Sequence, residues 1–197
     1  MSADLRTWAG IVFAAFALAG CGGSRPSFKS TDVTGADYGK DFALTDHTGK
    51  ARTLADFRGK AVVMFFGYTR CPDVCPTTLA ELKAVKDQLG EDGKRLQVLF
   101  VTVDPERDTQ GLLATYVPAF DASFLGLYGD SAATARVAKD FRVFYQKSPG
   151  KAPDGYTVDH TAGSYVFDPQ GRLRLFVRHG NAANLAADVR ILLNASG

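Results

Sequence analysis

The chain has 197 residues, of which 46% are hydrophobic and 22% are charged, so it can bury enough apolar surface to fold and is not a disordered protein. Its length suits one well-filled hydrophobic core and is short for two. Lys and Arg total 23 against 21 Asp and Glu, and these charges are scattered along the chain. This balance argues against nucleic-acid binding, which needs a concentrated basic surface.

The N-terminus has the features of a secretory leader. Arg6 precedes an apolar run at residues 8–18, which is shorter than the roughly 20 residues that a membrane-spanning helix needs. The small residues before Cys21 resemble the lipobox of bacterial lipoproteins. This resemblance implies that residues 1–20 are a lipoprotein signal peptide and that Cys21 is acylated. An uncleaved anchor, or cleavage that leaves Cys21 free, is the alternative. Either way, we expect the folded part outside the cytoplasm, and the lipoprotein interpretation places it on the periplasmic side of the bacterial cell envelope, lipid-anchored to a membrane.

The segment after the leader has a different composition from the rest of the chain. It is rich in Gly, Ser, Thr and Asp and poor in large apolar residues. We therefore expect residues 21–40 to form a flexible, solvated tether and residues 41–197 to form a single domain.

Hydrophobic patterns predict the elements of that domain in chain order. A small hairpin is expected at residues 42–54, a strand buried on both faces at 61–67, and an amphipathic helix after residue 76. The other elements are a buried strand at 96–103, a helix at 110–117, a short strand at 124–128, a helix at 132–141, a hairpin at 164–177 and a helix at 184–193. Residues 148–160 are polar and contain Pro and Gly, so we expect a long irregular loop there. The order predicts an α/β, thioredoxin-like sandwich, in which helices flank both faces of a mixed β-sheet that carries an N-terminal hairpin.

Cys71 and Cys75 lie where the first buried strand gives way to the helix. The positive end of a helix dipole stabilises a thiolate there, which favours nucleophilic attack and metal binding. Four residues apart, the two side chains are expected on one face, where they can share a metal ion or form a disulfide. Pro72 and Pro76 stiffen this segment and argue against a regular helix between them.

A third ligand is expected for a metal site, and the chain offers three histidines. His47 is expected to be a solvated turn residue, and His179 follows the last strand. His160 precedes an apolar strand at the edge of the sheet where the cysteines are expected. Two thiolates and one imidazole suit Cu(I), tolerate Cu(II) and leave Zn(II) one ligand short. The residues alone leave a metal site, a catalytic thiol pair and a structural disulfide open.

Three sequence blocks make a resemblance specific. Residues 67–76, residues 103–109 and the segment 158–161 followed by Tyr165 resemble the signature blocks of the Sco/SenC family, in family order. The likeness extends from about Phe42 to the C-terminal helix. Many family members have a His where Arg70 stands, which affects the charge near the site rather than the ligand set.

This resemblance implies a monomeric copper chaperone that assists metallation of the CuA centre of cytochrome c oxidase. Cys71, Cys75 and His160 are then the ligands of one copper ion. The CuA-bearing oxidase subunit is the implied partner, and another copper carrier is a second candidate partner. With only Met1 and Met64 in the chain, a Met-rich copper site is excluded.

Three carboxylates are candidates for a supporting role around the site. Asp159 is expected either to orient the His160 imidazole or to cap a turn. Asp73 either tunes the charge of the site or is a solvated turn residue. Asp104 ends a strand beside the site, where Asp-Pro is also an ordinary turn opener.

Two enzymatic functions are the alternatives to a chaperone. A thiol–disulfide reductase acting on the oxidase's CuA cysteines would use Cys71 and Cys75 as its redox pair, although thioredoxin-type catalysts use the shorter C-x-x-C spacing. A peroxidase of the peroxiredoxin kind would need Pro and Thr before its reactive Cys, and residues 67–70 offer only Thr69.

Overall fold

The computed structural model describes residues 26–149 and 155–195. The predicted signal peptide and Cys21 lie outside the described residues. Among the residues described, no helix is both long and apolar enough to cross a bilayer.

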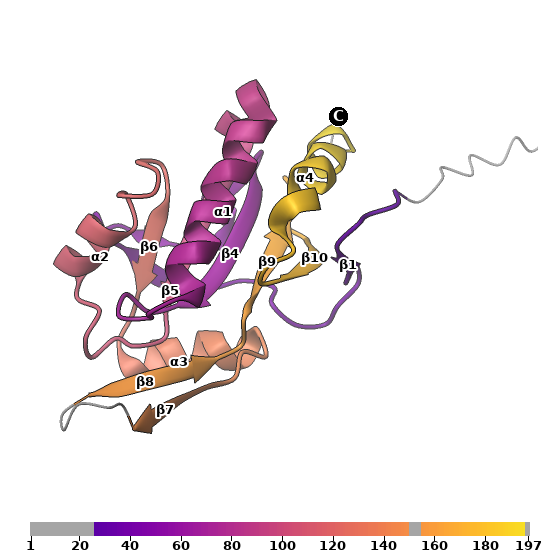
Figure 1. Cartoon of the computed structure of the whole chain (residues 1–197). Coiled ribbons are helices and arrows are strands. Elements are labelled where there is room, and N and C mark those ends of the chain that lie inside the picture. Colours follow the sequence, from indigo (N-terminus) through magenta and orange to yellow (C-terminus); the bar gives the residue numbers. More distant parts are fainter. Residues whose placement is uncertain (1–25, 150–154, 196–197) are drawn as a thin grey trace, which may run out of the picture.

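A mixed β-sheet forms the centre of the described chain (Figure 1). Its strand order is β1-β10-β9-β4-β5-β6-β2-β3, in which β4, β5 and β6 run parallel and the other described neighbours pair antiparallel. The strands are β1 (Thr31–Asp32), β2 (Leu44–Asp46), β3 (Ala51–Arg52), β4 (Ala61–Gly67), β5 (Leu96–Thr102), β6 (Leu125–Tyr128), β9 (Gly163–Phe167) and β10 (Leu173–Arg178). β2 and β3 form the predicted N-terminal hairpin.

Helices cover both faces of this sheet, which confirms the predicted fold class. The α-helices are α1 (Val74–Leu89), α2 (Gln110–Tyr116), α3 (Ser131–Asp140) and α4 (Leu185–Asn194), and the short 3-10 helices are η1 (Leu54–Phe57), η2 (Gly90–Arg95) and η3 (Ala182–Asn184). Successive side chains of a strand point to opposite faces. Gly67 of β4 lies against Cys75 of α1, whereas Phe66 packs on Phe141 at the end of α3, with ring centroids 5.4 Å apart.

β4 and β5 are buried along their whole length, as the uninterrupted apolar run of β4 and the mostly apolar sequence of β5 predict. The helix that follows β4 differs from its prediction, because it begins at Val74, before Cys75 and Pro76. Proline is tolerated there because the N–H groups of a first helical turn have no partner within the helix. Cys75 therefore lies in the first turn of α1.

The expected tether at residues 21–40 is wrong for the part that the structure describes. β1 pairs with β10, and the Val33 N–H donates to the Arg174 carbonyl at 2.8 Å. The buried Asp188 of α4 accepts hydrogen bonds from the backbone N–H groups of Lys29 and Ser30, at 2.9 and 2.8 Å. The folded domain therefore begins before residue 41, close to residue 28.

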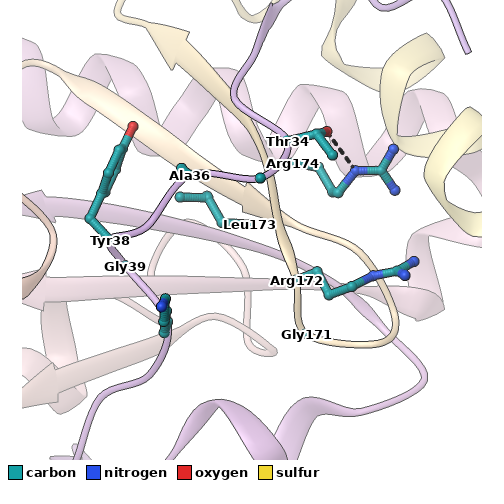
Figure 2. A pocket seen from close by; sticks show the side chains of 10 residues that line it. Thr34, Ala36, Tyr38, Gly39, Gly171, Arg172, Leu173 and Arg174 are labelled. Atoms are coloured by element: carbon teal, nitrogen blue, oxygen red, sulfur yellow. Dashed lines mark hydrogen bonds between the residues drawn. The ribbon is translucent and has the colours of Figure 1, made fainter. Parts of the chain in front are cut away.

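A pocket of about 550 Å³ lies between this N-terminal segment and the turn before β10 (Figure 2). Tyr38, Leu173 and Arg174 are among its lining residues, and Arg174 Nε donates to Thr34 Oγ1 at 2.9 Å. None of the predicted site residues lines this pocket, so it is separate from the group of Cys71, Cys75 and His160.

The expected irregular loop at residues 148–160 is wrong for most of the part that the structure describes. β7 (Tyr145–Pro149) and β8 (Tyr156–His160) pair antiparallel and form a small two-stranded sheet of their own. The segment was hidden from pattern analysis because most of its residues are polar and only Val158 of β8 is buried. His160 is consequently the last residue of a strand.

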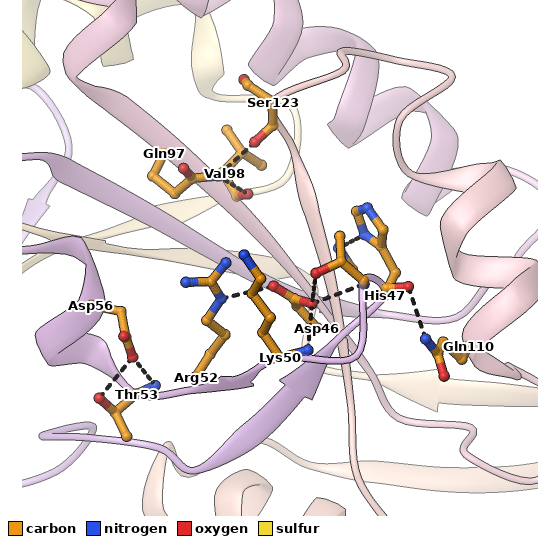
Figure 3. A network of polar contacts seen from close by, with 12 residues as sticks. Asp46, His47, Lys50, Arg52, Thr53, Asp56, Gln97, Val98, Gln110 and Ser123 are labelled. Atoms are coloured by element: carbon orange, nitrogen blue, oxygen red, sulfur yellow. Dashed lines mark hydrogen bonds and ion pairs between the residues drawn. The ribbon is translucent and has the colours of Figure 1, made fainter.

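His47 holds the N-terminal hairpin against the sheet, although it was expected to be solvated. Its Nδ1 accepts from the Gly126 N–H at 3.0 Å, and its carbonyl accepts from Gln110 Nε2 at 3.2 Å (Figure 3). Asp46, next to it, is buried and pairs with Arg52 at 2.7 Å. Burial alone raises the pKa of Asp46, but hydrogen bonds from Thr48, Arg52 and the backbone outweigh it and lower the pKa to about 2.

Candidate metal centre

Three side chains from two distant segments converge at one end of the sheet. Cys71 is half-buried in the loop after β4, Cys75 is fully buried in the first turn of α1, and His160 ends β8. Their ligand atoms all lie within 4.8 Å of one another. Cys75 Sγ is 3.6 Å from His160 Nε2. Metal bonds are about 2.3 Å long to sulfur and about 2.0 Å long to nitrogen. A sulfur and a nitrogen bound to one ion in a trigonal site would therefore be about 3.7 Å apart. The observed distance between Cys75 Sγ and His160 Nε2 fits this value.

Glycine at the end of β4 is what allows Cys75 to lie so close to the sheet. A Cβ on Gly67 would stand 2.8 Å from Cys75 Sγ and 2.9 Å from the Phe100 ring. Any larger residue at this position would push the sulfur away from the place where the three ligands meet.

The loop that carries Cys71 is fixed by a buried carboxylate. Asp108 accepts hydrogen bonds from the Thr69 N–H at 3.0 Å, from Thr69 Oγ1 at 2.6 Å and from Thr102 Oγ1 at 2.6 Å. Burial raises the pKa of Asp108, because a charged carboxylate loses its hydration there. Asp108 thus ties the loop two residues before Cys71 to the end of β5.

The imidazole of His160 presents its Nε2 to the sulfurs. Its Nδ1 lies 3.1 Å from the Thr161 carbonyl oxygen, which can only accept, so Nδ1 carries the proton in this hydrogen bond. This hydrogen bond leaves Nε2 as the ring nitrogen that faces the sulfurs. The edges of two aromatic rings hold the imidazole, with centroids 6.0 Å away for Tyr68 and 6.1 Å for Phe65.

The two thiols differ strongly in acidity. The hydrogen bond from the Cys75 thiol is the main cause that lowers the pKa of Cys71 to about 3, with a further contribution from His160. The same hydrogen bond to Cys71, followed by burial, raises the pKa of Cys75. The Cys75 N–H also reaches Cys71 Sγ, at 3.4 Å. Cys71 is therefore the thiolate of the pair and Cys75 is the buried thiol that supports it.

The comparisons with known proteins bear on this site. The sequence matches the SCO1/SenC family over residues 30–194. The chain belongs to the SCO1/SenC family.

Individual relatives extend this result. The chain is 41% identical over 150 residues to the mitochondrial protein SCO2 homolog of Bos taurus. The aligned segment covers 75% of this chain and 56% of that protein. It spans about half the length of the first curated relatives it matches. Among solved structures, it resembles Bradyrhizobium japonicum ScoI with copper bound at 42% identity and a TM-score of 0.72, covering 80% of this chain and 99% of the other. It also resembles apo Sco1 from Thermus thermophilus at 42% identity and a TM-score of 0.75, covering 86% and 99%.

Of the residues that sequence reasoning selected in this SCO1/SenC chain, the three expected ligands come together. Cys71 and Cys75 are free thiols in this structure. His179 does not join them, because its Nδ1 is hydrogen-bonded to Thr78 Oγ1 at 2.9 Å.

The three expected supporting carboxylates have different surroundings. Asp159 is exposed and accepts from Ser148 Oγ at 2.6 Å, so the partner of the imidazole is the Thr161 carbonyl rather than Asp159. Asp73 is exposed at the N-terminus of α1. Asp104 is buried and bonds Arg107 and Tyr156. Arg70 is exposed.

Sequence reasoning missed several residues that shape this SCO1/SenC site. They are Gly67, Tyr68, Asp108, Arg107 and Tyr156. The signal for Asp108 and Arg107 was present, since both lie in the block at residues 103–109 that follows a buried strand, and polar residues at the carboxyl end of such a strand often serve a site.

Proposed function

We propose that this chain is a copper metallochaperone that binds one copper ion through Cys71, Cys75 and His160 and works outside the cytoplasm. The observation that carries the proposal is the convergence of two sulfurs and an imidazole nitrogen within 4.8 Å. Soft thiolate ligands favour Cu(I), and a three-ligand set is short for a closed zinc site. The copper-bound state of the similar B. japonicum ScoI supports the choice of metal.

The site suits delivery of copper as well as its capture. Three ligands leave room for an incoming thiolate, so copper can pass by ligand exchange without first becoming free. Cys71 and His160 are both partly exposed, whereas Cys75 is buried. A recipient ligand therefore approaches from the side of Cys71 and His160.

Copper titration of the reduced protein tests this proposal. We expect one copper ion per chain in isothermal titration calorimetry, and a large loss of affinity in His160→Ala, where only the two sulfurs remain to hold the ion. His179→Ala is the matched control, because it removes a nearby imidazole that is hydrogen-bonded to Thr78 and is not a ligand. Binding in His160→Ala equal to that of the wild type would refute the ligand assignment.

We further propose that the recipient is the CuA centre of cytochrome c oxidase, reached by docking of the monomeric chaperone on the CuA-bearing subunit, with another copper carrier as the donor. This role is the one that the Sco/SenC resemblance implies. Mixing the copper-loaded protein with a copper-free CuA domain should produce the CuA absorption bands. Copper that stays on the chaperone would refute this client.

The place of action is proposed from the N-terminal sequence. Residues 1–20 act as a lipoprotein signal peptide, and acylated Cys21 anchors the domain to a membrane on the periplasmic side. The short span from Cys21 to the docked segment near residue 28 keeps the domain near that membrane. Replacing Cys21 by Ser should release the protein into the soluble periplasmic fraction. A variant that stays in the membrane fraction would refute lipid anchoring at Cys21.

A thiol–disulfide reductase is the second candidate, favoured by the partly exposed Cys71 thiolate beside a second thiol. The Cys71 thiolate attacks one sulfur of a substrate disulfide and expels the other as a thiolate. After losing its proton, Cys75 attacks the mixed disulfide at Cys71, so the chain is oxidised to a disulfide and the substrate gains two electrons. An insulin-reduction assay of the wild type and of His160→Ala separates the two functions. A reductase reduces insulin in both forms, because His160 is not part of the redox pair. A dedicated chaperone is nearly inactive in this assay even as the wild type.

A further inference from the structure

The hairpin that carries His160 is joined to the rest of the molecule by few backbone contacts. β7 and β8 form a separate two-stranded sheet, and such a hairpin is marginally stable by itself. At its base, Phe144 N–H donates to Thr161 Oγ1 at 3.0 Å and Thr161 N–H donates to the Phe144 carbonyl at 2.9 Å. The outer end of β8 needs another attachment if His160 is to stay over the cysteines.

Arg107 supplies that attachment. Its guanidinium lies 3.5 Å from the centroid of the Tyr156 ring, and its Nη1 donates to the Tyr156 carbonyl oxygen at 2.9 Å. Arginine thus holds both the side chain and the backbone of the first residue of β8. A stacked, partly buried guanidinium is among the stronger cation–π contacts.

The other side of the clamp is anchored in the rigid sheet. Asp104 lies two residues after the end of β5, is 1% exposed, and pairs with Arg107 Nε. Its other oxygen accepts from the Tyr156 hydroxyl at 2.7 Å, and its N–H donates to Thr102 Oγ1 at 3.0 Å. Asp104, Arg107 and Tyr156 therefore form a closed set of contacts, here called the Arg107 clamp, between the end of β5 and the start of β8.

The clamp and the metal ligand share one face of the hairpin. Tyr156, Val158 and His160 alternate along β8, so their side chains point the same way, and Val158 is 4% exposed. Tyr68 connects the two ends of this face. Its ring lies 5.8 Å from the Arg107 guanidinium and 6.0 Å from the His160 ring. A change at Arg107 is thus passed to His160 through a strand and through an aromatic ring.

We propose that Arg107 is a positioning residue for copper: by clamping the start of β8 to the end of β5, it keeps His160 over Cys71 and Cys75 and slows copper release. This inference rests on the proposed function. Lys147 contacts the same Tyr156 ring at 4.7 Å but is about half exposed and pairs with Glu106, so it lacks a link to the sheet. Lysine cannot replace Arg107, because it lacks the planar fork that stacks and bonds two acceptors at once.

Copper release into an excess of a chelator tests the clamp, with Arg107→Met as the main variant and Lys147→Met as its matched control on the same ring. We expect Arg107→Met to release copper about tenfold faster than the wild type. Arg107→Lys should release copper almost as fast as Arg107→Met, whereas the release rate of Lys147→Met should stay within about twofold of the wild type. The Cu(II) spectrum of Arg107→Met should shift toward that of His160→Ala. In the His160→Ala background, Arg107→Met should have no further effect on release, because the clamp acts only through His160.

Hydrogen exchange of the copper-free protein gives a readout independent of metal. Amides of β7 and β8 should exchange faster in Arg107→Met, while those of β4 and β5 stay unchanged. If Arg107→Met fails to fold, Tyr156→Leu carries the test, because it removes the stacked ring and leaves the ion pair with Asp104. The inference would be overturned if these variants released copper and exchanged the amides of β7 and β8 at wild-type rates. It would also be overturned if Arg107→Met accelerated copper release equally with and without His160. A wild-type protein that binds no copper would overturn the proposed function instead, and hairpin exchange would then judge the clamp.

Discussion

Gly67→Ala is a sharp test of how the end of β4 shapes the site. The new Cβ would stand 2.8 Å from Cys75 Sγ, 2.9 Å from Phe100 and 3.0 Å from Phe65. Real Cβ contacts are essentially never shorter than 3.0 Å, so Cys75 and an aromatic ring must move. Because β4 is buried on both faces, the strand has little room to shift.

Overpacking of this kind costs about 1–3 kcal/mol, which for a domain of this size lowers Tm by about 2–4 °C per kcal/mol. Copper affinity should fall as well, although no ligand has been removed, because the nearest displaced atom is the Cys75 sulfur. Thermal unfolding of the copper-free protein measures the first effect and copper titration the second.

Gly111→Ala is the control for this experiment. Gly111 lies in α2 with no other atom within 4 Å of a Cβ placed there, so alanine should be neutral or stabilise by up to about 1 kcal/mol. A Gly67→Ala protein with the Tm and copper affinity of the wild type would refute the argument that glycine is needed for the approach of Cys75.

Further expectations concern charge and anchoring. Since Cys71 has a pKa of about 3, it is a thiolate at every pH above that value. The rate of its alkylation by iodoacetamide should therefore vary little from about pH 5 to about pH 8. A rate that rises tenfold per pH unit, as for a free thiol with a pKa of about 8.5, would contradict the assignment. Asp108→Ala leaves the buried Thr102 hydroxyl and two partly buried donors of Thr69 without their acceptor. We therefore expect a loss of about 2–4 kcal/mol in urea unfolding and weaker copper binding; Asp108→Asn, which keeps one acceptor oxygen, should lose less. Asp188→Ala should detach the N-terminal segment and make residues 28–40 sensitive to limited proteolysis. Asp87→Ala, on the exposed face of α1, is the control and should be cleaved like the wild type. Equal cleavage of the two variants would contradict the anchoring role of Asp188.

The parts of the fold that could be predicted are those whose burial follows from the hydrophobic pattern of their own residues. Residues 61–67 are apolar throughout, and residues 96–102 are apolar except for Gln97 and Thr102, because both faces of β4 and β5 are covered. This pattern is visible without any partner strand. The prediction that Cys71 and Cys75 lie together is confirmed, because the short loop before α1 brings Cys71 beside the first turn of the helix. His160 needed the argument from the edge of the sheet and the family resemblance, since 85 residues separate it from Cys75.

The features that pattern analysis missed depend on partners far away in the chain. β1 is exposed along both its residues and is held by backbone pairing with β10 and by the Asp188 side chain, so its own composition resembles a tether. The hairpin of β7 and β8 is mostly polar because the main sheet does not cover it. In each case a distant carboxylate, Asp188 or Asp104, replaces the hydrophobic pattern that would have revealed the contact.

The ligands of the proposed copper site are held with unequal firmness, and this inequality sets an order for copper transfer. Cys75 belongs to the first turn of a 16-residue helix and is fully buried, so it is the ligand least able to leave. Cys71 lies in a loop fixed by Asp108 through Thr69 and stays partly exposed. His160 belongs to a separate two-stranded sheet. Local opening requires less free energy in an element with few buried contacts. We therefore expect the imidazole to leave first, while both sulfurs still hold the ion and an incoming thiolate takes the vacated position.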